Sequence, residues 1–170
     1  MIQRSAVISE CGSYRYRLSR WWDDGPRVVW MMMNPSTADA YEDDPTIRKC
    51  MGFARTWGYA GIEVVNLFPL RSTDPMQLLK AANPLGFDGA HVIADVVKSS
   101  DLLIAAWGCE SVIRKLVKGG FHPLATFNDI RRGWPELRIE CLGKSKTGNP
   151  YHPLMLAYST PRQPYGASTD

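Results

Sequence analysis

The chain has 170 residues, of which 45% are hydrophobic and 22% charged, and its formal net charge is +3. This length and composition are typical of one globular domain and exclude disordered and collagen-like classes. The slight positive charge permits contact with nucleic acid but does not argue for it, because dedicated nucleic-acid binders carry clustered lysine and arginine. The longest apolar run, residues 28–33, is too short to span a bilayer, so we expect no membrane partner.

The predicted elements begin with a β-hairpin over residues 6–18, in which two alternating arms flank the turn residues 11–13. The continuous apolar run over residues 28–33 predicts a strand that is buried on both faces. A helix follows, from Asp44, a capping residue that precedes proline, to the stop signal at Gly58.

The alternation of strand and helix continues to the end of the chain. Residues 121–137 fit neither period, and we interpret them as a strand, an irregular segment or an insertion. The residues after Tyr158 are rich in Pro, Ser, Thr and Gly, so we expect one domain over residues 1–158 and a flexible tail over 159–170. Further strands are predicted at 62–65, 102–106 and 138–142, and further helices at 75–83, 87–98 and through 113–117.

This order of elements predicts an α/β fold of three layers, α/β/α, around a mostly parallel sheet. In such sheets, ligands bind at the carboxyl ends of the strands. The polar segments of the sequence follow the predicted strands, so we expect them to converge on one site.

The first polar segment, residues 33–39 (MNPSTAD), directly follows the buried strand. Asn34 offers both donors and an acceptor, and Asp39 offers a base or a charge stabiliser. The alternative interpretation is a turn capped by Asx and Ser/Thr side chains. The other predicted binding residues of this region are Pro35, Ser36, Thr37 and Arg48, which lies one turn into the following helix.

The second polar segment, residues 65–71, is typical of a reader of a planar polar ring. Asn66 would make a paired amide contact, Phe68 would offer a stacking face, and Arg71 would meet a phosphate. The alternative places Phe68 in the core and makes Asn66 a turn former. Trp107, after the third buried strand, either walls the site or plugs the edge of the sheet.

The third polar segment, residues 142–154, is a glycine loop with two lysines, Lys144 and Lys146, that leads to Tyr151 and His152. His152 could donate to a developing oxyanion or bind phosphate. A solvated basic loop and a structural histidine are the alternatives. The loop is no phosphate loop, because Arg138 stands where that motif needs a glycine.

The cysteines and histidines predict neither a metal centre nor a bound cofactor. Three histidines lack metal-ligand spacing, and no two cysteines form a Cys-x-x-Cys pair. The chain also runs from its first residues straight into an alternating pattern, so we expect no secretory segment, reduced thiols and a cytoplasmic location. The four cysteines are Cys11, Cys50, Cys109 and Cys141.

Six segments of the chain together resemble the bacterial and phage family named domain of unknown function 1643. The resemblance covers about residues 5–156, and the family name itself supplies no function. The segments are residues 33–39, 44–48, 57–59, 65–68, 107–108 and 148–154.

More distantly, the order of elements is similar to that of the uracil-DNA glycosylase superfamily. The Asn-Pro at residues 34–35 resembles the mismatch-specific branch, in which the Asn positions water, and residues 64–66 resemble the base-reading strand. Residues 152–154 resemble the late His-Pro-Ser-Pro loop, with leucine in place of serine. The Gly-Gln-Asp-Pro of the first loop and a long intercalating leucine loop are not evident.

This second resemblance implies base excision, in which an N-glycosylase releases a modified base from nucleic acid, DNA in the first instance. Asn34, helped by Asp39, would position water, and His152 would stabilise charge on the departing base. Asn66 would read the base and Phe68 would stack on it. Two alternatives stay open: an enzyme that acts on a free nucleoside or nucleotide at the same bond, and a non-catalytic module that binds a modified base or nucleotide.

Overall fold

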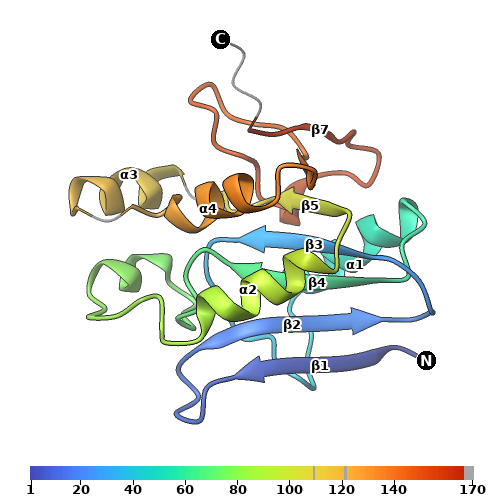
Figure 1. Ribbon diagram of the computed structural model, residues 1–170, viewed down its shortest axis with the longest axis horizontal. Coiled ribbons are helices and arrows are strands. Elements are labelled where there is room, and N and C mark those ends of the chain that lie inside the picture. Colours follow the sequence, from blue (N-terminus) through green and yellow to red (C-terminus); the bar gives the residue numbers. More distant parts are fainter. Residues whose placement is uncertain (109, 121, 167–170) are drawn as a thin grey trace.

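The computed structural model describes residues 1–108, 110–120 and 122–166. In these residues the chain forms one seven-stranded sheet with the strand order β1-β2-β4-β3-β5-β6-β7 (Figure 1). The strands are β1 (Gln3–Ile8), β2 (Arg15–Trp21), β3 (Arg27–Met32), β4 (Gly61–Asn66), β5 (Leu102–Ala105), β6 (Arg138–Cys141) and β7 (Gln163–Pro164).

The sheet is mixed, which corrects the prediction of a mostly parallel sheet. The four central strands, β4-β3-β5-β6, are parallel to one another. The pairs β1–β2, β2–β4 and β6–β7 are antiparallel. The predicted N-terminal hairpin is confirmed, but its second strand joins the edge of β4, and alternation along the chain carries no information about such an attachment. The α/β class is confirmed.

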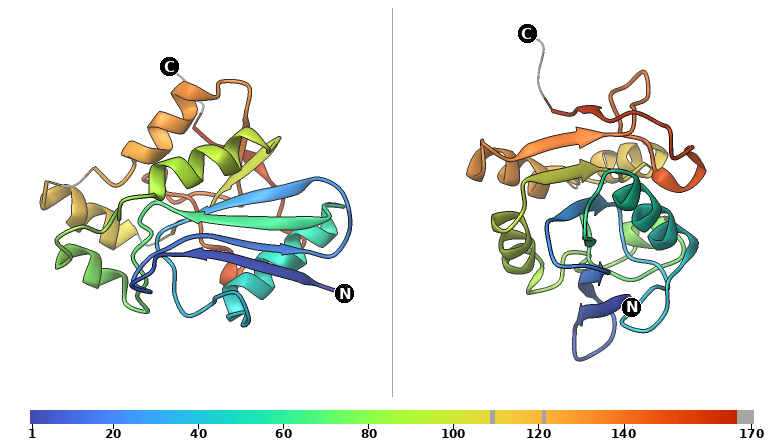
Figure 2. Two further views of the ribbon diagram at one scale, coloured as in Figure 1. Left: turned by 60° about the horizontal axis from the view of Figure 1, so that its bottom comes forward. Right: turned by 90° about the vertical axis from the view of Figure 1, so that its right-hand side faces the viewer.

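Helices cover both faces of the sheet, as Figure 2 shows. Helix α1 (Pro45–Thr56) covers one face, and α2 (Gly89–Lys98), α3 (Glu110–Lys118) and α4 (Ala125–Gly133) cover the other. Side chains alternate along β3, so that Val28 and Trp30 pack with α1 whereas Val29 and Met31 pack with α2. The continuous apolar run of this strand therefore reflects burial on both faces.

Helix α1 begins where its sequence predicts. The side chain of Asp44 accepts a hydrogen bond of 2.9 Å from the backbone N–H of Ile47, and proline occupies the first helical position. Gly58, at φ 77°, follows the end of the helix. These signals fix the N-terminus of α1 beside the carboxyl ends of the parallel strands.

Helix α4 lies in the segment 121–137, for which a strand, an irregular segment or an insertion was expected; the described residues contain a helix and no strand, with irregular residues on both sides of the helix. Phe127 and Ile130 are buried at a spacing of three residues, and the rest of the helix is mostly polar and partly or fully exposed. Its N-cap position is Leu124, whose side chain makes no capping hydrogen bond, so the sequence carries no start signal. Position 121, the first of that segment, lies outside the described residues.

The residues after the short helix η2 (Pro153–Met155) run back across the domain. The Tyr158 ring packs on Phe53 of α1, with ring centroids 5.1 Å apart, and Gly52 leaves room for it. Strand β7 then pairs with β6, and Tyr165 packs against Trp107. Contacts thus extend to the segment for which we expected a loose tail; residues 167–170 lie outside the described residues.

In the described part of the chain, no helix combines the length and the apolar character needed to cross a membrane. Three of the four cysteines, Cys11, Cys50 and Cys141, carry free thiols. Cys109 lies outside the described residues.

Candidate functional site

A cavity of about 150 Å³ lies at the carboxyl ends of β3, β4 and β5. The chain leaves β3 toward β4 through α1 on one face, and leaves β4 toward β5 through α2 on the other face. The loops after β3 and β5 therefore diverge, and such a switch point is where α/β sheets bind ligands. The polar side chains in the walls belong to Arg15, Asn34, Ser36, Asp44, Thr46, Asn66, Ser72, Thr73, Trp107 and His152.

The cavity thus gathers five of the residues that the sequence singled out, one or more from each polar segment. Asn34 and Ser36 follow β3, Asn66 ends β4, Trp107 follows β5, and His152 comes from the late loop. Pro35 is buried beside them, and its carbonyl accepts a 2.9 Å hydrogen bond from the backbone N–H of Ser72.

The structure directs other predicted site residues elsewhere. The Asp39 carboxylate accepts hydrogen bonds from the backbone N–H groups of Tyr41 (2.8 Å) and Glu42 (3.0 Å), which also lower its pKa. Phe68 is 3% exposed and belongs to the core, as in the alternative interpretation. Four other predicted residues lie outside the cavity walls and are exposed: Arg48, Lys144, Lys146 and Tyr151.

Asn34 is oriented by its own loop. Its Nδ2 donates to the carbonyls of Pro35 (3.1 Å) and Ser72 (2.9 Å), which lie on two segments far apart in sequence. Because the amide nitrogen is occupied by these two carbonyls, the amide oxygen Oδ1 is the atom that can accept from a ligand or a water molecule.

Arg15 is the residue that the sequence did not reveal. It is 3% exposed, its Nη1 donates to the carbonyl of Ala38 (2.7 Å), and its Nη2 reaches Oδ1 of Asn66 only at 3.4 Å. Its Nε is buried and has no hydrogen-bond partner, and among the described residues no carboxylate pairs with it.

The charge of Arg15 is retained despite this burial. Desolvation lowers its pKa to about 10, while the negative charge of Asp44 opposes the shift. A guanidinium with that pKa is still protonated at neutral pH. An unpaired buried charge destabilises a protein, so Arg15 provides the cavity with a strong attraction for anionic or electron-rich ligands.

His152 enters the cavity as a neutral side chain. Burial lowers its pKa below the ordinary value of 6.5. Its Nδ1 accepts a 3.3 Å hydrogen bond from the backbone N–H of Leu154, which assigns the proton of the neutral ring to Nε2. Nε2–H is therefore a hydrogen-bond donor that carries no net charge.

The loop that carries His152 is attached to the end of β5 by Asn149. Its Oδ1 accepts from the indole Nε1 of Trp107 (3.1 Å), and its Nδ2 donates to the carbonyl of Gly108 (2.7 Å). Gly108 has φ 54°, and a Cβ at this position would lie 2.8 Å from Cβ of His152. The Trp-Gly and Gly-Asn-Pro motifs therefore contact each other and hold the loop of His152 next to the end of β5.

A shallower groove of about 430 Å³ adjoins the cavity, and Ser36, Ser72 and Thr73 line both. We call it the hydroxyl groove. It places two predicted binding residues, Thr37 and Arg71, beside the cavity although neither lines the cavity itself.

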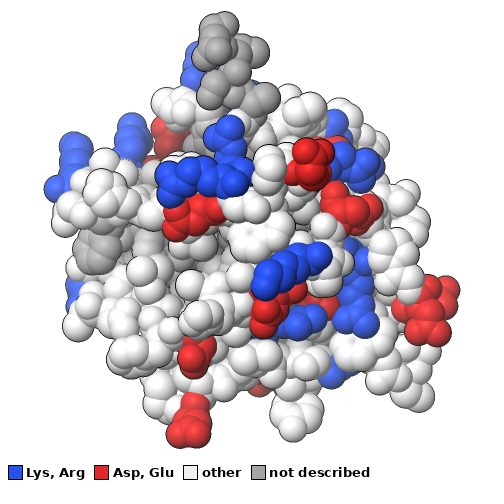
Figure 3. Space-filling view, in the orientation of Figure 1, with Lys and Arg blue, Asp and Glu red and all other residues white. Residues whose placement is uncertain are grey.

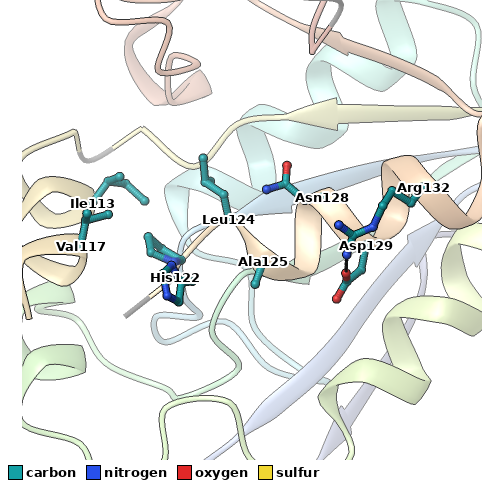
Figure 4. A pocket seen from close by; sticks show the side chains of 9 residues that line it. Ile113, Val117, His122, Leu124, Ala125, Asn128, Asp129 and Arg132 are labelled. Carbon is teal, nitrogen blue, oxygen red and sulfur yellow. Dashed lines mark hydrogen bonds and ion pairs between the residues drawn. The ribbon is translucent and has the colours of Figure 1, made fainter. Parts of the chain in front are cut away.

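A further cavity, of about 360 Å³, lies between α3 and α4 (Figure 4). Ile113, Val117 and Leu124 give it a mostly apolar wall, and its charged groups, Asp129 and Arg132, pair with each other. His122 lies here and not with His152. Because its charges are already paired, this cavity is a poorer candidate for chemistry than the one at the strand ends.

Charged side chains of both signs are interspersed on the face shown in Figure 3. This face therefore has no single basic surface of the kind that follows a nucleic-acid backbone. In residues 1–108, 110–120 and 122–166, no group of three or more His, Cys, Asp or Glu side chains is placed to hold a metal ion.

The chain belongs to the family described as proteins of unknown function, DUF1643, whose model matches residues 15–154. No curated protein and no solved structure matches the chain. The matched segment begins at Arg15 and ends two residues after His152, so it includes every residue in the walls of the cavity.

Proposed function

We propose that this protein is an N-glycosylase that releases a nucleobase from nucleic acid. The observation that carries the proposal is the buried, carboxylate-free guanidinium of Arg15 in a small cavity that also contains a neutral histidine. Drug-sized ligands occupy pockets of about 300–1,000 Å³. A cavity of about 150 Å³ is instead suited to a single ring system, such as an extruded base.

Base release needs groups that stabilise the departing base. The bond between the sugar carbon and the base nitrogen breaks, and its electron pair remains on the base. Arg15 and the Nε2–H of His152 are donors that can stabilise this negative charge, and in a dry cavity such donors are worth more than in water. The positive Arg15 provides the larger share, since its charge is opposite to that of the leaving group.

The nucleophile is a water molecule that Oδ1 of Asn34 orients. Its oxygen bonds to the sugar carbon and loses one proton, which neutralises the departed base. The sugar becomes positively charged as the bond breaks, so a carboxylate near it is stabilising. We assign this role to Asp44 and not to the predicted Asp39, because Asp44 lines the cavity, although its Oδ1 also caps α1, whereas Asp39 lies outside the cavity walls.

Base recognition is assigned to Asn66. Asn66 is 2% exposed, and Nη2 of Arg15 reaches its Oδ1 only at 3.4 Å, so its amide can exchange this long contact for a paired contact with a base. Trp107 lies in the cavity walls, but its ring is 0% exposed and belongs to the same core cluster as Phe68, so we assign a stacking face to neither ring. We also propose that the parallel strands β4-β3-β5-β6 correspond to a uracil-DNA glycosylase-like core.

The test is a panel of single- and double-stranded oligonucleotides that carry uracil and other modified bases, assayed for alkali-labile abasic sites. We expect one base to be released, and release to be lost in Asn34→Ala, whose folding is checked by circular dichroism. Arg132→Gln, a change at an exposed arginine far from the cavity walls, is the matched control. Tight, salt-dependent binding without release would overturn catalysis and favour a module that binds a modified base.

A free nucleoside or nucleotide is the second candidate substrate. The specific observation in its favour is the interspersed charge in Figure 3, which offers no continuous path for a phosphate backbone on that face. Incubation with nucleosides and nucleoside monophosphates, followed by chromatography of the free base, distinguishes it. Release from these compounds but from no oligonucleotide would select the second candidate.

A further inference from the structure

The hydroxyl groove next to the cavity has the composition of an anion-binding surface. Its one charged wall residue is Arg71, its one large apolar wall residue is Leu70, and no carboxylate contributes to its walls. The other side chains in its walls all carry hydroxyl groups and come from Ser13, Ser36, Thr37, Ser72 and Thr73. Arginine with hydroxyl donors is a typical environment for a phosphate group.

Most N–H donors of the Arg71 guanidinium make no hydrogen bond within the described residues. Its Nη1 donates to the carbonyl of Gly12 at 3.3 Å, which is a long hydrogen bond, and no ion pair involves it among the described residues. An arginine carries five N–H donors in a planar fork that matches a phosphate. Most of that fork is available to a ligand in the groove.

The walls of the groove are held by backbone hydrogen bonds. The N–H of Arg71 donates to the carbonyl of Ser13 (2.9 Å), and the N–H of Ser72 donates to the carbonyl of Pro35 (2.9 Å). The hairpin tip, the loop after β3 and the segment after β4 are thereby joined. A groove built this way is already formed before a ligand arrives, which reduces the entropic cost of binding.

The groove and the cavity share the wall residues Ser36, Ser72 and Thr73, so the two hollows are neighbours. In a nucleotide, a sugar links the base to a phosphate. A base beside Arg15 therefore places its sugar near the shared wall and its phosphate toward Arg71.

We propose that the hydroxyl groove is a phosphate subsite and that the substrate is a phosphorylated one, in which the phosphate ester next to the sugar contacts Arg71. The assignment of the base to the neighbouring cavity rests on the proposed function, whereas the phosphate subsite itself does not. The phosphate could belong to a free nucleotide or to a nucleic-acid strand, and the experiment separates these two sources.

Inorganic phosphate tests the groove without reference to any base. We expect it to shift the amide resonances of residues 12–13 and 71–73 in NMR spectra of the intact protein. Arg71→Gln should weaken phosphate binding about tenfold or more, which is the usual effect of removing a charged hydrogen-bond donor. Arg132→Gln should leave it unchanged, and Arg71→Lys should recover part of it. Equal binding of phosphate to the wild type and to Arg71→Gln would overturn the subsite.

A second comparison uses deoxyuridine, deoxyuridine 5′-monophosphate and a single-stranded oligonucleotide that contains uracil. If Arg71→Gln weakens binding of the monophosphate, the substrate is a free nucleotide. If it weakens binding of the oligonucleotide alone, the substrate is a nucleic-acid strand. If Arg71→Gln weakens deoxyuridine binding as much, Arg71 is structural and the subsite is wrong. If base is released and Arg71→Gln changes neither binding nor rate, the proposed function stands and the subsite is wrong. If phosphate binds through Arg71 but no base is released, the subsite stands and the proposed function is wrong.

Discussion

Two arginines of β2, Arg15 and Arg20, are both buried, at 3% and 0% exposure, and yet have different surroundings. Arg20 pairs with the carboxylate of Asp43 through a 2.7 Å contact of its Nε, and its Nη groups donate to the backbone carbonyls of Ser19, Asp39 and Glu42. Arg15 has one good hydrogen bond, to Ala38, and a buried Nε without a partner.

The comparison teaches that burial alone does not tell a structural arginine from a functional one. The protein itself satisfies the charge of Arg20 and uses it to fasten the loop of residues 39–43 to the sheet. The charge of Arg15 is satisfied only in part, because its Nε has no hydrogen-bond partner, and Arg15 lines a cavity. We infer that Arg20 stabilises the fold. We also infer that Arg15 destabilises the fold and is retained because it binds a ligand.

The largest expected effect is on activity, in Arg15→Met. Removing one donor that stabilises a developing anion lowers rates by about 100- to 1,000-fold. Stability should be unchanged or raised, because an apolar side chain of similar size replaces a charge that has no carboxylate partner. Initial rates of base release and urea denaturation measure the two effects. A fully active Arg15→Met variant would contradict the role of Arg15, and a destabilised one would contradict the comparison with Arg20.

Arg20→Met should show the opposite combination. It leaves the nearly buried Asp43 with Arg4 as its remaining partner, and breaking a buried ion pair from one side costs about 3–5 kcal/mol. We expect a loss near the lower end of this range, since Arg4 stays in place. Urea denaturation at neutral pH measures it, and Arg4→Gln, at the exposed side of the same carboxylate, serves as the matched control with an effect below about 1 kcal/mol.

The sequence predicted the part of the site that depends on position along the chain. Asn34, Asn66 and Trp107 each stand at the end of a buried strand, and the carboxyl ends of parallel strands meet at one edge. It did not predict the direction of side chains such as Asp39, whose carboxylate turns back on its own loop. Such directions depend on turn geometry, which composition does not determine.

The sequence did not predict the burial of Arg15, for a different reason. In the sequence it alternates with tyrosines, which is the pattern of a strand with one solvated face. Strand β2 lies between β1 and β4, so it is interior to the sheet, and the loop after β3 covers Arg15. Burial of this arginine thus follows from a pairing of strands separated by about forty residues, and no local signal reports it.

Gly108→Ala should lower both stability and activity, whereas Arg15→Met should lower activity alone and Arg20→Met stability alone. The position has φ 54°, and the new Cβ would press on His152. Strain of this kind costs about 1–3 kcal/mol, and displacement of His152 should lower base release about tenfold or more. Thermal unfolding and initial rates measure these effects. Gly133→Ala, at a helix end where a Cβ meets no other atom within 4 Å, is the control that should change neither.

The smallest expected effect is a pH dependence of stability that distinguishes His152 from both arginines. Burial lowers the pKa of His152 in the folded state below 6.5, the value in the unfolded chain. At a pH between the folded-state pKa and 6.5, the unfolded chain therefore binds more protons than the folded one. Stability is therefore full above pH 6.5 and falls as the pH drops toward the folded-state pKa, by at most about 1.4 kcal/mol per pH unit. His152→Gln should remove this part of the slope, which urea denaturation between pH 5 and 7.5 measures. If the slopes of the variant and the wild type coincide, His152 is not held neutral by the fold, and the uncharged donor that we assign to it beside Arg15 is lost.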